Sequence, residues 1–520
     1  MIPLDSGLAE HVGVSIGDDQ VMRFPPPLGA TRDLAARRAT LLIGLAGGAL
    51  LVAMTAPFMT RYGWDRDELY FLAAAHHLAF GYVDFPPLIA VIGWIAEHPA
   101  PNSLLALRAV SLAAGATTVV LVAFIARELG GGHRAQWLAV ISWALTPYIL
   151  GSASIFHPTW LDAVAWVAFL YVAVRMLVRR QPRLWLLLGV IAGIGLEAKY
   201  TIAFLTLAFV LALLLAGERR QLASTWPWMG LAIAVALLVP NLVWQIQHAW
   251  PSIHFFSSQN AATASDTSRP AYIAQQLLLL GVPALLAGVG VVSLWRRQRR
   301  ALALIPVLVT ALFLFERGRS YYPLPADALA VAAGAIAVDQ WLQTSRRLLL
   351  LSALLTVQVA VIALAGPIVI PFYSTRQLVS SSIWKLGYFK DEIGWLEMTS
   401  QVQRAWSSLP ATERIGGAIL AHNYGEASAL AFYDRGLPPI LSGHLSWQYW
   451  HPERLPLRHV LTIGYQPQAL KLLCSSWRVI THVENGWHLN NEERGQPIAT
   501  CTLTHPLGSD WKWLIASNQL

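Results

Sequence analysis

Residues 64–88, WDRDELYFLAAAHHLAFGYVDFPPL, lie between two long apolar stretches and contain four acids, Asp65, Asp67, Glu68 and Asp84. An ionised carboxylate beside hydrocarbon is costly, so we expect each acid to have a cap, a partner or a chemical task. Acids in the first turn of a helix gain only about 0.3–1 kcal/mol, which accounts for one of them but not for four so close together. The stretch therefore predicts a functional loop at a membrane boundary.

The composition is that of a membrane protein. Of the 520 residues, 55% are hydrophobic and 13% are charged, whereas soluble domains carry about 25% charged residues. The net charge of +8 does not indicate nucleic-acid binding, because the arginines cluster in short loops between apolar segments and so form an orientation signal. The first apolar run starts near residue 39 and is too long for the core of a cleavable signal peptide.

The apolar pattern predicts a polytopic α-helical membrane protein with about 11 transmembrane helices. The pair at 184–216 is ambiguous, because it fits either two short crossings or one long helix broken near Gly195. The expected spans are roughly 39–60, 104–127, 135–152, 159–178, 184–197, 199–216, 226–246, 272–294, 301–315, 323–342 and 347–371.

Alternate connections are basic, which predicts that they lie in the cytoplasm together with the N-terminus. This assignment requires two crossings within 184–216, because a single crossing would put Arg219 and Arg220 outside. The other connections then face outward and contain most of the remaining charged side chains. We expect a multi-pass protein of the bacterial inner membrane whose C-terminal domain is extracytoplasmic. The basic loops contain Arg127 and Arg134, Arg175 to Arg183, Arg219 and Arg220, Arg296 to Arg300, and Arg346 and Arg347.

Four regions follow from the changes in composition. Residues 1–38 are expected to be a disordered cytoplasmic tail, and 39–372 a transmembrane catalytic domain with an outer loop at 61–103. Residues 373–414 are expected to form a connector on the membrane surface. Residues 415–520 alternate strand and helix patterns, which predicts a small α/β domain with strands at 418–423, 459–465 and 478–483 and helices at 426–436 and 467–477. Both cysteines, Cys474 and Cys501, fall in this domain; an oxidising compartment permits a disulfide, but the spacing does not show that they meet.

Three further motifs place polar side chains on the outer side. GIGLEAKYT (193–201) puts Lys199 at a helix end, where it could also simply extend its ammonium into the headgroups. ERGRSYYPLPAD (316–327) contains Arg317 and Arg319, which break the rule that basic loops lie inside and offer donors suited to a phosphate. Asp162 lies inside a predicted span, where an acid usually has a partner or a function.

The pair DELYF and GYVDFPPL resembles the first outer loop of the protein O-mannosyltransferases and their bacterial relatives. That broad family includes the enzyme that adds aminoarabinose to lipid A. The segments KYT (199–201), RGRSYYPLP (317–325), NYGEASALAFYDRG and LSGHLSWQYW are similar to later parts of bacterial glycosyltransferase-family-39-like proteins. Asp84 lies one position closer to the prolines than its counterpart in the mannosyltransferases. The resemblance implies a GT-C fold and a sugar donor linked to a polyprenyl phosphate.

The resemblance also implies roles for the residues that carry it. Asp67 would act as general base on an acceptor hydroxyl, with Glu68 as the second catalytic acid. The phosphate would meet cations and hydroxyls, and direct displacement would invert the anomeric carbon. The acids could also hold a divalent cation, although no spacing matches a known ligand motif and no cofactor is required. The expected substrate-binding residues are Asp65, Asp84, Asp162, Lys199, Tyr200, Arg317, Arg319, Tyr321 and Tyr322.

Two other classes of function are open alternatives. A transporter or flippase of a lipid-linked or small polar substrate would also be apolar, but transporters place charges near the bilayer midplane in paired broken helices. Here the charges are predicted at the outer boundary and no internal repeat is evident, which favours a transferase. A non-enzymatic assembly subunit is the third alternative. The expected partners are the lipid-linked donor, a lipid, glycan or protein acceptor, and membrane lipids, and no nucleic acid.

Overall fold

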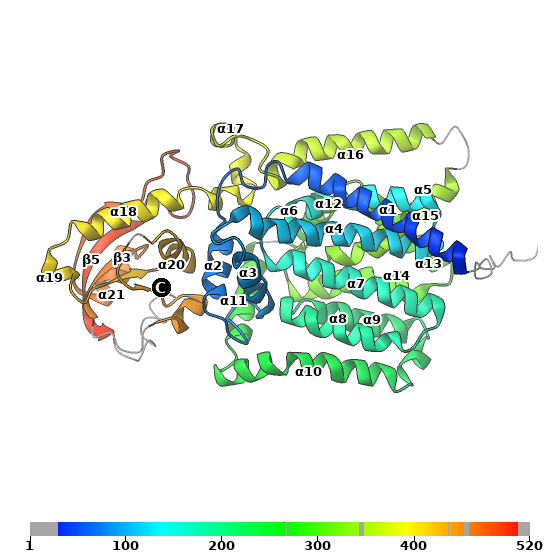
Figure 1. Cartoon of the computed structure of the whole chain (residues 1–520), viewed down its shortest axis with the longest axis horizontal. Helices are drawn as coiled ribbons and strands as arrows, with labels where there is room; N and C mark the ends of the chain where they lie inside the picture. Colours follow the sequence, from blue (N-terminus) through cyan, green and yellow to red (C-terminus); the bar gives the residue numbers. More distant parts are fainter. Residues whose placement is uncertain (1–29, 267, 343–347, 435, 452–456, 508–520) are drawn as a thin grey trace, which may run out of the picture.

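The computed structural model describes residues 30–266, 268–342, 348–434, 436–451 and 457–507. A bundle of helices makes up one part of the molecule, and a sheet with its own helices lies at one end of the bundle (Figure 1). The predicted tail falls mostly outside the described residues, but residues 30–38 are helical and begin the first long helix. Asp33 and Arg37 pair one turn apart there, at 2.9 Å, which favours a helix over a disordered segment.

Among the described residues, four helices are long and apolar enough to cross a bilayer, and a bent pair would make a fifth. They are accompanied by shorter apolar helices, so the predicted number of about 11 crossings stays a prediction. The helices of the bundle are α1 (Ala30–Thr55), α4 (Leu104–Glu128), α5 (His133–Ala144), α6 (Pro147–Ser152), α7 (Pro158–Arg179), α8 (Leu184–Ala198), α9 (Ile202–Leu215), α10 (Trp226–Gln247), α11 (Pro251–Asp266), α12 (Arg269–Leu280), α13 (Pro283–Arg296), α14 (Arg300–Glu316), α15 (Asp327–Trp341) and α16 (Leu348–Val369).

Several predicted segments of the bundle differ from the structure, and one of them breaks at a proline. The span expected at 135–152 breaks before Pro147 into α5 and α6. The span expected at 272–294 is the pair α12 and α13, which bends by 102° around Gly281, whose positive φ of 65° suits a residue without a side chain. The segment 247–270, predicted to be a loop, contains α11.

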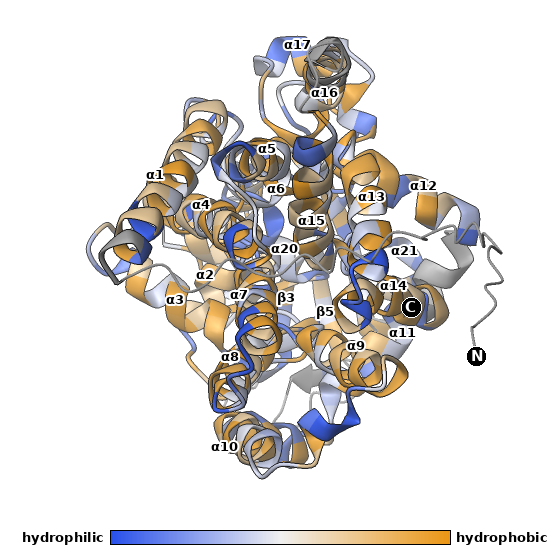
Figure 2. Cartoon of the chain, turned by 90° about the vertical axis from the view of Figure 1, so that its right-hand side faces the viewer, coloured by the Kyte–Doolittle hydropathy of each residue, from blue (hydrophilic) through white to orange (hydrophobic). Residues whose placement is uncertain are grey.

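The basic connections that the structure describes lie together at one end of the bundle, whereas Arg346 and Arg347 fall outside the described residues. Arg127 at the end of α4 contacts Asp33 at the start of α1 at 2.5 Å. Arg179 at the end of α7 pairs with Glu128 at 2.7 Å. The segment 184–216 forms two helices, α8 and α9, so the chain leaves this end and returns to it, as the orientation argument requires. Figure 2 views the bundle from this end, where hydrophilic residues mark the connections and hydrophobic residues cover the helices.

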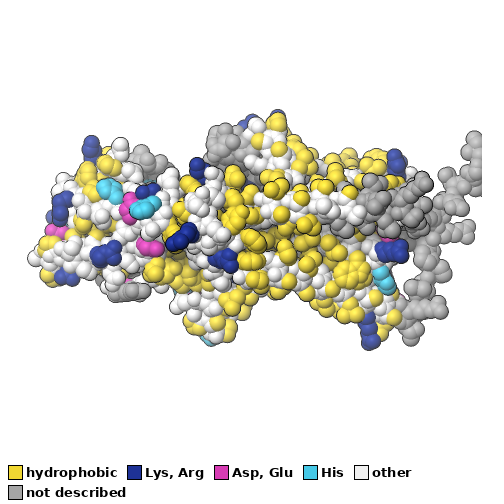
Figure 3. Space-filling view, turned by 90° about the horizontal axis from the view of Figure 1, so that it is seen from above, with side chains coloured by type: hydrophobic (Ala, Val, Ile, Leu, Met, Phe, Trp, Pro, Cys, Tyr) yellow, Lys and Arg dark blue, Asp and Glu magenta, His cyan; other side chains and the backbone are white. Residues whose placement is uncertain are grey.

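The surface of the bundle is apolar between its two ends. The space-filling view in Figure 3 shows hydrophobic side chains over the helical part. Charged side chains gather on the sheet domain and at the end of the bundle farthest from it. A band of exposed hydrocarbon between two polar ends is suited to lipid and would be costly in water. On α10 the exposed large side chains include Trp228, Met229, Leu231, Val235, Leu237, Val239, Val243 and Ile246.

The C-terminal part contains a five-stranded mixed sheet in the order β2-β1-β3-β5-β4. β1 is parallel to β2 and β3, and β5 is antiparallel to β3 and β4. Strands β1, β3 and β4 and helices α20 and α21 occupy segments that the pattern predicted, whereas β2 and β5 were not predicted. The elements are β1 (Ala418–Ala421), α20 (Tyr424–Phe432), β2 (Ile440–Leu441), β3 (Leu457–Ile463), α21 (Pro467–Leu473), β4 (Cys474–His482) and β5 (Pro497–Leu507).

The helix α18 (Trp395–Ser407) packs on this sheet. This position differs from the membrane surface that the sequence predicts for the connector. Its apolar residues recur at helical spacing and are buried in one cluster with Ile419, Ala421 and α20. An amphipathic helix hides its apolar face in any apolar environment, and here the sheet provides it. The unit built on the sheet therefore begins at α18 and not at residue 415. The buried residues of α18 are Trp395, Met398, Thr399, Val402, Ala405 and Trp406.

A disulfide joins Cys474 at the start of β4 to Cys501 in β5, with their Cα atoms 5.5 Å apart. Cys474 follows the last residue of α21, so the helix predicted at 467–477 ends earlier than expected. The two strands are neighbours in the sheet, which brings the two thiols together. The bond also ties the end of α21 to the strand that the sequence pattern missed.

We expect the Cys474→Ala/Cys501→Ala variant to lower the unfolding free energy of the C-terminal domain by about 3–4 kcal/mol, the value for a closed loop of this length. The loop spans 27 residues. Thermal unfolding in detergent, with and without reductant, measures the effect. Reductant should lower the wild-type melting temperature and leave the variant unchanged. Two alkylatable thiols in unreduced, denatured wild-type protein would contradict the assignment.

Candidate active site

The first helix of the outer loop, α2 (Arg66–Ala75), begins in a capping box. The Asp65 carboxylate accepts from the Asp67 backbone N–H at 2.8 Å, and the Glu68 carboxylate accepts from the Asp65 N–H at 2.9 Å. Such a box satisfies two donors that the first turn of a helix leaves open. Asp65 is only 5% exposed. Its predicted role in substrate binding does not fit this position, because its side chain determines where α2 begins.

Glu68 is fully buried, and both of its carboxylate oxygens are occupied. Arg108 of α4 donates from Nε and Nη2, both at 2.7 Å, and the Phe156 N–H donates at 2.8 Å. The same guanidinium bonds the carbonyls of Met59 and Gly63 and lies 3.2 Å from Glu392. A carboxylate with its lone pairs filled cannot take a proton from a substrate. The structure therefore gives Glu68 a structural position in place of the predicted catalytic one.

Asp67 is the accessible acid of this turn, with 35% of its side chain exposed. The Tyr424 hydroxyl donates to Asp67 Oδ1 at 2.7 Å, and His157 Nε2 lies 3.5 Å from Oδ2. Burial by itself would raise the pKa of Asp67. The hydrogen bonds of His157 and Tyr424, with the positive charges nearby, outweigh burial and hold that pKa below its usual value. Asp67 is thus ionised at neutral pH and suited to accept a proton.

Asp84 lies in a different environment from Asp67. The Tyr70 hydroxyl donates to Asp84 Oδ1 at 2.9 Å. Burial raises the pKa of Asp84 to about 7, with the charge of Asp67 adding to the shift and the Tyr70 hydrogen bond opposing it. Two neighbouring carboxylates with separated pKa values are a common arrangement of acid and base.

The chain that carries Asp84 is held by α10. Asn241 donates to the Phe80 carbonyl at 3.0 Å, and Gln245 donates to the Tyr82 carbonyl at 3.2 Å. The Tyr200 hydroxyl lies 3.0 Å from Asn241 Oδ1. Tyr200, predicted to bind substrate, therefore supports the amide that holds the Asp84 loop.

Lys199 ends α8 and faces two aromatic rings. Its Nζ lies 4.2 Å from the centre of the Tyr322 ring and 5.1 Å from that of Tyr321. The nitrogen is buried and has no hydrogen-bond partner within the residues described. Close by in sequence, the Thr201 hydroxyl donates to Asp162 Oδ1 at 2.7 Å. A buried ammonium with open donor capacity is prepared for an anion.

Arg317 and Arg319 are both exposed at the end of α14. Arg317 ends the helix in a left-handed conformation, with φ of 60°. Arg319 Nη2 lies 3.4 Å from the Gln259 side-chain oxygen of α11. Neither arginine forms an ion pair in the part of the chain that the structure describes. Contacts among the described residues therefore do not hold the two arginines beside Lys199, where they are predicted to bind the phosphate. Both arginines nevertheless lie on the connection that continues to Tyr321 and Tyr322.

The acids and the lysine lie at the same end of the bundle. His157, which faces Asp67, is the residue before α7, and Asp162 follows five residues later, about 7.5 Å along the helix axis. Lys199 ends α8 where Thr201 begins α9 against Asp162. This end lies opposite the basic connections of α4 and α7. The structure therefore places the four charged groups Asp67, Asp84, Asp162 and Lys199 at the same end of the bundle.

Two features bear on bound ligands. No group of three or more His, Cys, Asp or Glu side chains is arranged to hold a metal ion in the described part of the chain. A shallow pocket of about 190 Å³ lies on the sheet, away from the carboxylates. Its lining includes His459, Trp477, Arg478, Thr500 and Thr502.

Three residues of this site were missed from sequence. Arg108 lies in the apolar run LLALRAVSL, and a charge inside a span is a signal that could have identified it. Tyr70 is not among the site residues that the sequence predicts. Tyr424 starts a helix of the sheet domain, and nothing local in its sequence shows that it reaches Asp67.

We expect Glu68→Ala to lower the stability of the protein, because it leaves Arg108 buried without its partner. Breaking a buried ion pair on one side typically costs about 3–5 kcal/mol. Thermal unfolding of the purified protein in detergent measures the loss. Glu397→Ala, at an exposed position of α18, is the matched control and should change stability little. An unchanged melting temperature for Glu68→Ala would contradict the structural role.

Comparisons with known proteins agree with this architecture. Residues 84–244 match the family model of dolichyl-phosphate-mannose-protein mannosyltransferases. The lipopolysaccharide core galacturonosyltransferase RgtA of Rhizobium johnstonii is 32% identical over 104 residues, and the match covers 20% of this chain and only 20% of that relative.

Solved structures extend the likeness to most of the chain. ArnT from Cupriavidus metallidurans, bound to undecaprenyl phosphate, superposes with a TM-score of 0.53 at 14% identity, over 91% of this chain and 98% of that one. Its apo state gives a TM-score of 0.54 at 12% identity over the same shares of the two chains. The chain therefore shares the fold of ArnT over most of its length, and its segment from Asp84 to residue 244 is similar to the mannosyltransferase family model.

Proposed function

We propose that the protein is a membrane glycosyltransferase that moves a sugar from a polyprenyl-phosphate carrier to an acceptor hydroxyl, with inversion at the anomeric carbon. The family match supports glycosyl transfer, and the structural neighbour bound to undecaprenyl phosphate supports a donor of that kind. The observation that carries the proposal is that an accessible, ionised Asp67 and a buried Lys199, whose ammonium has no hydrogen-bond partner in the described residues, lie at one end of an apolar bundle.

In the proposed reaction, the acceptor hydroxyl gives its proton to Asp67 as its oxygen attacks the anomeric carbon. The bond from that carbon to the phosphate oxygen breaks on the opposite face, and the electron pair leaves with the lipid phosphate. General base catalysis of this type contributes typically 10²–10⁴-fold. The phosphate then carries more negative charge than in the donor, and Lys199 stabilises it. A leaving group stabilised in this way does not require a general acid.

The proposed location follows the positive-inside rule. The end of the bundle with Arg127, Arg179 and Arg299 is assigned to the cytoplasm, and the end with Asp67 to the outer side of the bacterial inner membrane. The sheet domain is then extracytoplasmic, where an oxidising environment would preserve the disulfide between Cys474 and Cys501. The acceptor is a lipid, glycan or protein.

We expect Asp67→Asn to lower kcat by about 10²–10⁴-fold, because the amide cannot accept the proton. Purified protein in vesicles, supplied with radiolabelled undecaprenyl-phosphate sugars and with membranes from a strain that lacks the gene, gives the rate. Mass spectrometry of those membranes identifies the acceptor. Binding of undecaprenyl phosphate should be unchanged.

Asp434→Asn, an exposed acid of the sheet domain, is the matched control and should keep the wild-type rate. Near-normal turnover of Asp67→Asn with donor binding intact would show that Asp67 is not the base. Uptake of substrate into sealed vesicles without sugar transfer would favour the transporter alternative. A loss of rate in EDTA that Mg²⁺ or Mn²⁺ restores would show that the acids also hold a cation.

We expect Lys199→Met to weaken binding of undecaprenyl phosphate by about tenfold or more, because a charge-assisted hydrogen bond to the phosphate is lost. The thermal shift on addition of that lipid measures binding without any sugar or acceptor. Lys471→Met, on the exposed face of α21, should bind as the wild type does. Equal affinity in the Lys199 and Lys471 variants would remove Lys199 from the phosphate site.

A further inference from the structure

The sheet domain shares a hydrophobic core with the outer loop, so more than a linker joins it to the bundle. Helix α2 packs against α20, and one continuous buried cluster contains side chains of both parts. The loop contributes Trp64, Leu69, Tyr70 and Phe71, and the sheet domain contributes Trp395, Leu430, Trp447 and Ile463. Separating the two would expose all of this surface to water, which is unfavourable.

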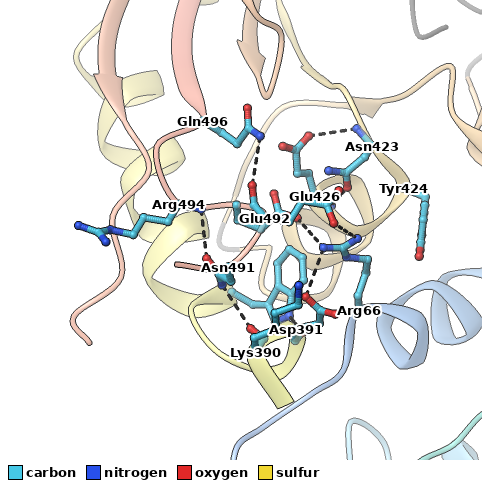
Figure 4. A network of polar contacts seen from close by, with 12 residues as sticks. Arg66, Lys390, Asp391, Asn423, Tyr424, Glu426, Asn491, Glu492, Arg494 and Gln496 are labelled. Carbon is cyan, nitrogen blue, oxygen red and sulfur yellow. Dashed lines mark hydrogen bonds and ion pairs between the residues drawn. The ribbon is translucent and has the colours of Figure 1, made fainter. Parts of the chain in front are cut away.

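A charged contact aligns the two parts within that core. Arg66 lies 2.6 Å from Glu492, 3.3 Å from Glu493 and 3.6 Å from Asp391 (Figure 4). Arg66 directly precedes Asp67, so the ion pairs fix the backbone that carries the proposed base. The stem of Arg66 crosses over Gly425, where an added Cβ would lie 2.5 Å from its Cγ.

Tyr424 is held rigidly at this contact. It is the first residue of α20, and a capping box of Asn423 and Glu426 fixes the start of that helix. Its ring packs on Tyr70 with the ring centres 4.8 Å apart. Its hydroxyl reaches across the boundary between the two parts to Asp67 Oδ1 at 2.7 Å.

The same domain also holds the second carboxylate of the loop. The Ser446 backbone N–H donates to the Tyr70 hydroxyl at 2.9 Å, and that hydroxyl donates to Asp84. The Ser446 hydroxyl accepts from the Val83 N–H at 3.0 Å, next to Asp84. Asp67 and Asp84 are therefore both positioned by residues of the sheet domain.

We infer that the C-terminal domain completes the active site, and that Tyr424 is a positioning residue that orients Asp67 for its role as base. The inference rests on the proposed glycosyl transfer. The Tyr424 hydroxyl takes one acceptor position of Oδ1. His157 lies beside Oδ2, and the second acceptor position of Oδ2 is left for the acceptor hydroxyl. Oriented in this way, the base does not need to find its geometry during the reaction.

Several charged and titratable groups face Asp67. Among them, Tyr424 can lose its hydrogen bond to Asp67 through the removal of a single oxygen atom. His157 approaches from α7, and Arg66, Asp65 and Glu68 belong to the same turn as Asp67. Asp84 and Asp391 add negative charge from neighbouring segments. Hydrogen bonding to the ionised form lowers a carboxyl pKa, so removal of the phenol hydroxyl raises that of Asp67.

The test is the pH dependence of kcat for Tyr424→Phe in the full-length protein, with the vesicle assay described above. We expect the acid limb of the profile to move to higher pH by about one unit. We expect kcat at its plateau to fall about tenfold, while KM for the lipid-linked donor changes less than about twofold. Tyr433→Phe, in the same domain but with its ring against Phe432, is the matched control and should keep the wild-type profile.

Each outcome separates this inference from the proposed function. If wild-type protein transfers no sugar from any donor, the proposed function fails and the inference fails with it. If the wild type is active and Asp67→Asn is not, an unchanged kcat and acid limb in Tyr424→Phe overturn the inference alone. A lower kcat with an unmoved acid limb also overturns it, because Tyr424 would then act only through packing. Thermal unfolding and undecaprenyl-phosphate binding of the variant show that it is folded.

Discussion

Arg108 places a full positive charge in the apolar helix α4, and the carboxylate of Glu68 accepts two hydrogen bonds of 2.7 Å from it. This pair ties α2 to α4, and through the Phe156 N–H it also fixes the chain just before α7. Neither charge could stay buried without the other. Asp67 is the next residue in the chain, so its place above the bundle, opposite His157, depends on that pair.

Four acids within one short stretch have four different environments, and these decide what each can do. Asp65 caps a helix, Glu68 balances an arginine, Asp84 lies against a tyrosine, and Asp67 alone is both ionised and open. Burial and hydrogen-bond partners thus decide which of these carboxylates have a structural role and which have a chemical one. The cations at the proposed site are distributed in the same way: Lys199 is buried against two rings, while Arg317 and Arg319 stay exposed.

The sheet domain takes part in this division of tasks. Its acids pair with Arg66, its Ser446 holds the phenol that meets Asp84, and its Tyr424 reaches Asp67. The sheet domain shares a hydrophobic core with the outer loop and holds that loop on one side, while α10 holds the same loop on the side of the bundle. The proposed base therefore lies where three parts of the chain meet, which gives it a rigid setting for proton transfer.

Apolar runs, basic connections and the carboxylate-rich loop were sufficient to predict a helical membrane protein with its polar groups at one end. These features are local, because the hydrophobic effect and the orientation of basic loops act on each segment by itself. The bend between α12 and α13, the burial of Glu68 by Arg108 and the reach of Tyr424 to Asp67 are not local. They depend on contacts between residues as far as 357 positions apart, and only the packed structure decides which distant side chain occupies the space beside each acid.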